Sequence, residues 1–298
     1  MSFAEFSAGA KVAVRVMALA SCGLVLAGCM DTLSSFNPFS KGETYKPEIV
    51  AEVPAPELYN DGLARIQKKD YEGAAKKFSD LEKQYPYSDW SRRALIMAAY
   101  AHYEGGQYED SITEARRYLQ MHPATPEAAY AQYLLAMSHF HQIPDVTRDQ
   151  DKAEKALLAL QELVDRYPNS EWAPDARQRI QVARDQIAGK EMEIGRFYLQ
   201  KRNYTGAINR FRTVVARYQT TRHIEEALER LTEAYLALGI VDEAQTAAAV
   251  LGHNFPDSPW YKDAYALLQK GGMEPRENSG SWISRAFRGI PQVGQRTG

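Results

Sequence analysis

Apolar residues recur at helical spacing through most of this chain, in segments that end at a polar turn or at a proline. Segments 57–69 and 71–84 both show this period, with the short turn Lys69-Asp70 between them. Pro86 ends the second segment, because proline cannot continue a helix and disfavours the helical conformation of the residue before it. The pattern predicts two antiparallel helices.

The same two-helix pattern recurs along the chain. A small residue marks the start of the second helix in each copy, and the marks are spaced by 37, 42, 54 and 37 residues. The small residues are Ala74, Ser111, Ala153, Ala207 and Ala244. A period of this size is typical of helical solenoids. We therefore predict an all-α fold, a solenoid of five helix pairs.

One of the longer intervals has a length that favours continuous helix. From Pro168 to Gly195 there are 27 residues, against 13 from Pro86 to Ala99. The 14 extra residues are close to four turns at about 3.6 residues per turn, so an insertion of this length keeps the same face inward. We predict one long helix over 174–201 that links repeats 3 and 4.

The two ends of the chain differ from the repeats in composition. Residues 31–56 contain four prolines, which remove backbone donors and prevent regular helices or strands. The predicted organisation is a signal peptide at 1–28, a Pro-rich linker at 29–56, repeats 1–3 at 57–173, repeats 4–5 at 174–270 and a disordered tail at 271–298.

The N-terminal segment has the pattern of a bacterial export signal. Lys11 and Arg15 precede an uncharged stretch, 16–27, that is too short to span a bilayer. It ends in Leu26-Ala27-Gly28-Cys29, which resembles the lipobox of bacterial lipoproteins. The resemblance implies cleavage before Cys29 and a covalent lipid on its thiol, and Met30 in place of an aspartate favours the outer membrane. An ordinary secretory signal and a short anchor helix are the alternatives.

Composition excludes several classes of function. The formal net charge is −2, which gives no electrostatic argument for a nucleic-acid partner. Both cysteines, Cys22 and Cys29, precede the repeats, so the repeats hold no disulfide or cysteine metal site. His139 and His141 lie two apart on a helix and point to different faces, so they do not chelate one metal. No catalytic motif is present, and we expect no enzyme, no metal and no cofactor other than the lipid.

The repeats resemble the tetratricopeptide repeat. Gly62, Ala74, Phe78 and Pro86 match that family's glycine, alanine, aromatic and proline at each interval. Gln219 replaces the proline in the fourth copy, which departs from the pattern. The resemblance implies that the first helix of each pair lines a concave surface.

Carrying the family's inward positions over gives a candidate peptide-binding groove. Its residues are Tyr59, Leu63, Ile66, Arg93, Ile96, Tyr100, Tyr103, Tyr130, Tyr133, Met137 and Phe140. Aromatic and flexible apolar side chains with one arginine suit an extended or amphipathic peptide rich in aromatics. The alternative is that several of them pack the solenoid core.

Three phrases extend the resemblance to one lipoprotein family. Tyr167-Pro168-Asn169-Ser170, Asp175-Ala176-Arg177-Gln178-Arg179 and Asn209-Arg210 are similar to the BamD (ComL) family of the outer-membrane β-barrel assembly machinery. This resemblance covers roughly residues 20 to 262. It implies a non-catalytic scaffold in the outer membrane, held by its lipid in the inner leaflet and facing the periplasm.

The family resemblance also implies partners. These are the barrel-forming subunit BamA, bound through its POTRA domain by the C-terminal repeats with Arg210 in the contact, and the other lipoproteins of the machinery. The N-terminal repeats are expected to receive the C-terminal β-signal of unfolded outer-membrane proteins. The alternatives are a Tol-Pal-associated periplasmic factor and a pilus-assembly lipoprotein. Cys29 and the absence of heptads in 31–56 argue against the former.

Overall fold

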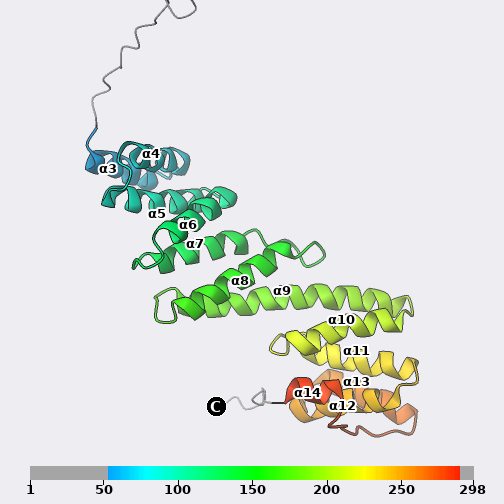
Figure 1. Cartoon of the computed structure of the whole chain (residues 1–298). Coiled ribbons are helices and arrows are strands. Elements are labelled where there is room, and N and C mark those ends of the chain that lie inside the picture. Colours follow the sequence, from blue (N-terminus) through cyan, green and yellow to red (C-terminus); the bar gives the residue numbers. More distant parts are fainter. Residues whose placement is uncertain (1–52, 289–298) are drawn as a thin grey trace, which may run out of the picture. The chain divides into compact units, whose positions relative to one another are not determined.

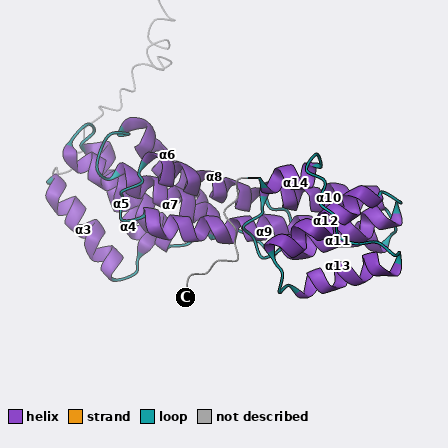
Figure 2. Cartoon of the chain, turned by 90° about the horizontal axis from the view of Figure 1, so that it is seen from below, coloured by secondary structure: helices purple, strands orange, loops and turns teal. Residues whose placement is uncertain are grey.

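A computed structural model describes residues 53–288, and every described element is an α-helix or a loop (Figures 1 and 2). The helices are α3 (Ala55–Gln67), α4 (Tyr71–Gln84), α5 (Asp89–Glu104), α6 (Tyr108–Met121), α7 (Ala128–Phe140), α8 (Asp151–Arg166), α9 (Ala173–Gln200), α10 (Tyr204–Arg217), α11 (Ile224–Ala237), α12 (Val241–Asn254), α13 (Pro259–Lys270) and α14 (Trp282–Phe287). Cys29, the predicted signal peptide and most of the predicted linker lie outside the described residues.

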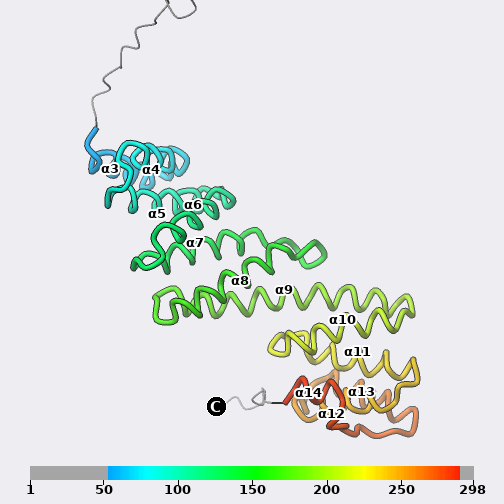
Figure 3. Tube along the Cα trace, in the orientation of Figure 1, coloured from blue at the N-terminus to red at the C-terminus, as the bar shows by residue number. Residues whose placement is uncertain are grey.

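Each helix from α3 to α12 packs against the next along the chain, which is the arrangement predicted for five helix pairs (Figure 3). First helices of neighbouring pairs also touch, since α5 contacts both α3 and α7. Their second-helix counterparts α4 and α6 make no comparable contact. The all-α repeat fold is therefore confirmed.

The turn inside a pair has one backbone solution that recurs. Lys69 and Gly106 occupy the left-handed region at φ 60° and 73°, and Arg202 and Gly239 do so at 58° and 73°. A left-handed residue after a helix closes its last turn and reverses the chain. After Lys69 and Arg202 the next helix starts with a side-chain cap, since Asp70 accepts a hydrogen bond from the backbone N–H of Gly73 and Asn203 accepts one from that of Gly206, both at 3.0 Å. After Gly106 and Gly239 the next helix has no such cap.

The predicted long helix is confirmed. Helix α9 runs without a break over 28 residues, and it packs on α8 as well as on α10 (Figure 1). Ala176, Ala183, Ala188, Met192 and Gly195 are buried along it, so the whole-turn insertion keeps one face inward.

The predicted disordered tail at 271–298 is wrong for its first part. Residues 282–287 form α14, which contacts α10 and α12 and buries Ile283 completely. The indole Nε1 of Trp282 donates a hydrogen bond to the Tyr235 hydroxyl at 3.1 Å. The apolar side chains Trp282, Ile283 and Phe287 pack on the core of the C-terminal pairs, and this burial orders a segment whose own sequence carries little helical signal.

Two further boundaries differ from the predictions. Helix α3 begins at Ala55, inside the predicted linker, because proline is tolerated in the first turn of a helix, where Pro56 stands. Helix α13 follows the fifth pair and packs on α11, so the C-terminal repeats end in an additional helix.

Candidate functional site

The residues predicted to line a groove share one face of the first helices but differ in exposure. Half-buried are Tyr59, Leu63, Ile66, Tyr100, Tyr103, Tyr130, Tyr133 and Phe140, while Arg93 is exposed. Ile96 is 6% exposed and Met137 is 1% exposed, so the prediction is wrong for these two. Their side chains turn into the core and cannot touch a ligand at the surface.

The half-buried tyrosines of α5 and α7 form one cluster with a tryptophan. The Trp172 ring lies 4.8 Å from the centroid of Tyr130 and 4.8 Å from that of Tyr133, and Tyr100 lies 6.5 Å from Tyr130. Trp172 is the residue immediately before α9, at its N-cap position. Three elements therefore build one surface, which we call the aromatic surface: Tyr100, Tyr103, Tyr130, Tyr133, Phe140 and Trp172.

A carboxylate and a guanidinium are held at the edge of the aromatic surface. The Tyr133 hydroxyl donates to Asp175 Oδ2 at 2.8 Å, and Arg179 Nε donates to the same oxygen at 2.6 Å. The Arg179 guanidinium lies 5.1 Å from the Phe140 ring centroid, within cation–π range. Burial opposes ionisation of Asp175, but the hydrogen bonds from Arg179 and Tyr133 hold its pKa below the usual range.

Burial also affects the tyrosine hydroxyls of this surface. Desolvation, followed by the hydrogen bond to Asp175, raises the pKa of Tyr133 to about 12. Desolvation likewise raises the pKa of Tyr130. Both rings are therefore neutral at physiological pH and present apolar faces with a polar tip, a combination suited to contact with aromatic partners.

A second aromatic group lies nearer the start of the solenoid. The Tyr59 ring lies 5.4 Å from Trp90, and the Arg93 guanidinium lies 5.5 Å from the Trp90 ring centroid. Among the described residues Arg93 makes no ion pair. It is therefore a cation available to a ligand, on the same helix as Tyr100.

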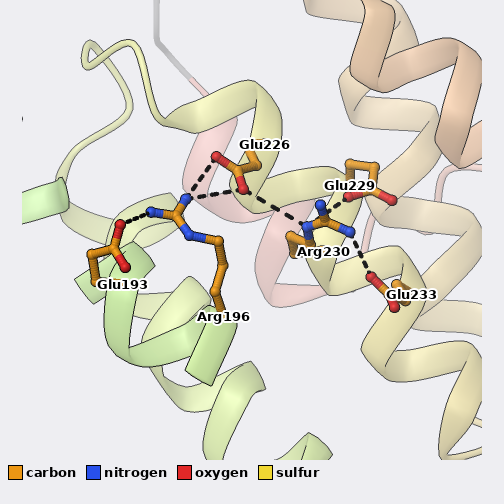
Figure 4. A network of polar contacts seen from close by, with 6 residues as sticks. All are labelled: Glu193, Arg196, Glu226, Glu229, Arg230 and Glu233. Carbon is orange, nitrogen blue, oxygen red and sulfur yellow. Dashed lines mark hydrogen bonds and ion pairs between the residues drawn. The ribbon is translucent and has the colours of Figure 1, made fainter. Parts of the chain in front are cut away.

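The first helices of the C-terminal pairs carry charge in place of rings (Figure 4). Arg196 of α9 donates to both carboxylate oxygens of Glu226 of α11, at 3.0 and 2.9 Å. Arg230 lies 3.7 Å from Glu226, pairs with Glu233 at 2.9 Å and places its guanidinium 5.4 Å from the Trp260 ring centroid. The two halves thus present different chemistry on equivalent helices.

Glu229 is the buried member of this network. Its side chain lies 3.3 Å from Arg230 Nε, yet burial raises the pKa of Glu229 to about 7 against the opposing charge of Arg230. Its Oε2 has no hydrogen-bond partner. The carboxyl is therefore partly protonated near neutral pH.

Arg210, the residue predicted to contact a partner, lies on a second helix, α10. Its guanidinium pairs with Glu191 of α9 at 3.3 Å, and it stays partly exposed. It does not join the aromatic surface or the network of Arg196 and Arg230.

Sequence reasoning missed Trp172, Asp175 and Arg179. A signal was present, because a tryptophan stands four residues after the turn proline in three copies: Pro86 and Trp90, Pro168 and Trp172, Pro256 and Trp260. Each of these tryptophans lies beside an arginine or a tyrosine of the first-helix face.

Metal-type clusters and membrane-spanning helices are both absent from the part of the chain that the structure describes. Within residues 53–288 no group of three His, Cys, Asp or Glu side chains has the arrangement that a metal ion requires. None of the helices there combines the length and the apolar character needed to cross a bilayer.

Comparison with known proteins places the chain among outer membrane lipoproteins. Residues 51–251 match the model of the YfiO family, described as outer membrane lipoprotein. The chain is 48% identical over 235 residues to the outer membrane protein assembly factor BamD of Caulobacter vibrioides, covering 78% of this chain and 77% of that protein. It is 39% identical over 259 residues to the same factor of Rickettsia prowazekii, covering 87% and 98%.

Similarity to solved structures is weaker. The TPR2AB domain:pHSP90 complex of yeast Sti1 aligns with 73% of this chain and 85% of that one, at 13% identity and a TM-score of 0.37. PilW, a type IV pilus biogenesis factor, aligns at 15% identity and a TM-score of 0.22, covering 70% and 96%. Scores this low carry no argument, and they give no support to the pilus-assembly alternative.

Proposed function

This chain belongs to the YfiO family of outer membrane lipoproteins, and from that premise we propose that it is an assembly factor for outer membrane proteins. Its relatives in Caulobacter and Rickettsia bear that description. In this proposal the protein is a scaffold without catalysis that receives unfolded clients on its N-terminal repeats. It hands them to a barrel-forming subunit and works beside the other lipoproteins of the machinery.

The observation that carries the client role is the aromatic surface. Its rings are half-buried, so they are rigidly held but still offer faces and edges to a partner. The expected clients are the final β-strands of outer-membrane proteins, and transmembrane β-strands alternate apolar with polar residues and carry aromatic residues at the membrane interfaces. Each aromatic pair adds about 0.5–1.5 kcal/mol beyond burial. Several such pairs give affinities on the order of micromolar, which suits a client that must be released.

The chain end of the client is expected to lie toward Arg93. A guanidinium matches the two oxygens of a terminal carboxylate, and Arg93 is the exposed arginine without an acidic partner on this face. Arg93 and Tyr100 are seven residues, or about 10 Å, apart along α5. An extended chain covers that distance in about three residues, so a carboxylate at Arg93 places the preceding aromatic residues on the tyrosines.

A site-specific photocrosslinker tests this site. With the photocrosslinker at position 100 or 133 of the protein, irradiation should crosslink a labelled peptide of the C-terminal β-strand of an outer-membrane protein. An excess of unlabelled peptide should reduce this crosslinking. The double variant Tyr100→Ala with Tyr133→Ala should weaken peptide binding at least tenfold, since two aromatic contacts are lost. Arg93→Gln should weaken binding of the free acid but not of the C-terminal amide.

Tyr265→Ala is the matched control, because Tyr265 is an exposed tyrosine of α13, away from the aromatic surface. Labelling confined to the C-terminal pairs, or unchanged binding in the double variant, would mean that the tyrosines only pack the solenoid.

The C-terminal repeats are the proposed docking region for the POTRA domain of a BamA-like subunit. Arg210 pairs with Glu191, and Arg196 of the charged network pairs with Glu226. These side chains can form ion pairs with a docked subunit in place of these pairs, while the helix packing stays unchanged. Arg210→Glu should lower copurification of that subunit while leaving client-peptide binding intact. Equal copurification would remove Arg210 from the contact.

A further inference from the structure

An open groove lies on the second-helix side of the N-terminal pairs. Helices α6 and α8 form its walls, α7 forms its floor, and its volume is about 630 Å³. Ile112, Leu119 and Leu135 line it together with Leu158, which is 67% exposed. This groove opens on other side chains than the aromatic surface, so the proposed client site does not account for it.

The equivalent groove of the C-terminal pairs is occupied by the chain itself. Helix α14 contacts both α10 and α12 there, and the hydrogen bond from Trp282 to Tyr235 ties it to the floor helix α11. Gln219, at the end of α10, donates to the carbonyl of Ala286 at 3.3 Å. A short helix that carries a tryptophan is therefore a ligand that this type of groove accepts.

The two grooves correspond residue by residue. Helices α6 and α10 start 96 residues apart, at Tyr108 and Tyr204, and α7 and α11 start 96 residues apart as well. By this register Arg116 corresponds to Arg212, whose guanidinium lies 4.9 Å from the Trp282 ring centroid. By the same register His139 corresponds to Tyr235, which accepts the indole hydrogen bond.

Both recognition side chains are unengaged in the open groove. His139 lines it and is only 7% exposed, and its Nδ1 has no hydrogen-bond partner. Burial, followed by the charge of Lys152, lowers the pKa of His139, so the imidazole is neutral and keeps one nitrogen as an acceptor. Arg116 makes no ion pair within residues 53–288.

Helix α8, one wall of the open groove, differs in charge from its counterpart α12 in the occupied groove. When Ala153 is aligned with Ala244, Lys152 corresponds to Glu243, which accepts a hydrogen bond from Ser281 at 2.6 Å just before α14. Lys155 corresponds to Thr246, whose hydroxyl accepts from the backbone N–H of Asn278 at 3.2 Å. Two lysines therefore stand where the occupied groove meets the N-terminal end of its helix. Lys152 pairs with Glu109 and Lys155 pairs with Asp151 at 2.7 Å, and both carboxylates are exposed, so an acidic residue of a docked helix can take their place.

We propose that the groove between α6 and α8 docks a short helix of a partner protein, which carries a tryptophan near its start and an acidic residue just before it. Arg116 covers the indole face, His139 takes the indole N–H, and Lys152 and Lys155 face the acidic residue. The partner thus binds on the opposite side of the repeats from the client.

A peptide with the sequence of α14 and its flanks tests the proposal. A fluorescein-labelled peptide of residues 279–288 that carries Ser281→Asp is titrated into the full-length protein in detergent, and fluorescence anisotropy reports binding. We expect saturable binding that Arg116→Ala weakens about fivefold, the effect of one cation–π contact. His139→Phe, which keeps a ring but removes the acceptor, should also weaken it, and Leu158→Glu should abolish it.

Matched variants locate the binding. Arg117→Ala changes the neighbouring arginine, which pairs with Glu82 instead, and should leave the affinity unchanged. Arg212→Ala, in the groove that α14 occupies, should also leave it unchanged. Equal affinity in Arg116→Ala, or no saturation at millimolar peptide, would overturn the proposal. Equal or tighter binding of the unmodified peptide would assign the groove to α14 of a second copy and overturn the acidic partner.

Discussion

At the scale of single residues, the repeat depends on a glycine that admits an aromatic ring. A Cβ on Gly62 would lie 2.6 Å from Cε1 of Phe78, and Gly195 stands in the same relation to Phe211. Both rings are fully buried, so neither can retreat into solvent. The two helices can cross this closely only because glycine carries a hydrogen atom where any other residue carries a Cβ.

Gly62→Ala overpacks the core, which costs about 1–3 kcal/mol, while its higher helix propensity returns about 1 kcal/mol. The variant should therefore be less stable than the parent by up to about 2 kcal/mol. Urea unfolding followed by circular dichroism measures the effect. Ala64→Ser, at an exposed position of the same helix, should change the stability by less than about 0.5 kcal/mol. A stable Gly62→Ala would show that the crossing can widen.

The buried Glu229 makes stability depend on pH. Its pKa is raised to about 7 in the folded state, above the ordinary 4.5, so the folded protein binds more protons than the unfolded chain between these values. Its contribution is therefore most favourable below pH 4.5 and is lost as the pH rises toward 7. Glu229→Gln should be more stable than the parent at pH 8, by up to about 3 kcal/mol, and equal to it at pH 4.

Thermal unfolding of both proteins from pH 4 to pH 8 measures this difference. Glu233→Gln is the control, because that carboxylate is more exposed and its pair with Arg230 lies at the surface. Parallel curves for the parent and Glu229→Gln would mean that Arg230 fully compensates the buried charge.

The sequence predicted which side chains lie on the same face of each helix. How exposed each side chain is depends on how the neighbouring helix pair packs over it. Tyr100 and Ile96 lie one helical turn apart on α5, yet only Tyr100 reaches the surface. The helical period groups both on one face and does not show how deeply the next pair covers each. Trp172 was missed for a related reason, since it precedes a helix and becomes part of the surface only when α9 packs beside α7.

At the scale of elements, helix boundaries followed from local signals. The turn at Lys69-Asp70 and Pro86 placed the first helix pair within a few residues, and the whole-turn excess between Pro168 and Gly195 placed α9 equally well. Helix α14 escaped prediction because six residues do not form a stable helix alone. Its order comes from Ile283 and Trp282 in the groove of α10 and α12, a contact between distant segments that periodicity does not report.

The continuity of α9 is a mechanical requirement, since its first half packs on α8 and its second half on α10. Val182→Pro should cost about 3 kcal/mol or more, because proline removes a backbone hydrogen bond and clashes with the preceding turn. The side chain of Val182 is 50% exposed, so Val182→Ala is the matched control and should be nearly neutral. Chemical unfolding compares the two.

A binding readout separates stability from geometry in the same variants. If Val182→Pro stays folded with a kink, a partner that touches only the N-terminal pairs should keep its affinity, and one that touches both halves should bind more weakly. An unchanged affinity for both kinds of partner would mean that α9 does not align the halves.

At the scale of the whole molecule, one repeat architecture carries two kinds of surface. Rings of α5 and α7 gather at Trp172, whereas α9 and α11 carry Arg196, Arg230 and their carboxylates (Figure 4). The first suits an apolar, loosely held client and the second a polar partner that must dock in one register. Under the proposed function, the separation of these surfaces along one chain would let a client and a docked subunit bind at the same time.

Attachment to the membrane is expected to depend on Cys29, which lies outside the described residues. The sequence Leu26-Ala27-Gly28-Cys29 predicts a lipid anchor through its resemblance to a lipobox. Burial of acyl chains contributes about 0.8 kcal/mol per methylene, so several chains hold a protein firmly.

Cys29→Ala should therefore leave the protein unacylated and shift it from the outer-membrane fraction to the periplasm. Cell fractionation measures this shift. The variant is overproduced, so that most of its copies have no docking subunit that could hold them at the membrane. A variant that still sediments wholly with the outer membrane, even when Arg210→Glu is added, would refute the lipid as the anchor.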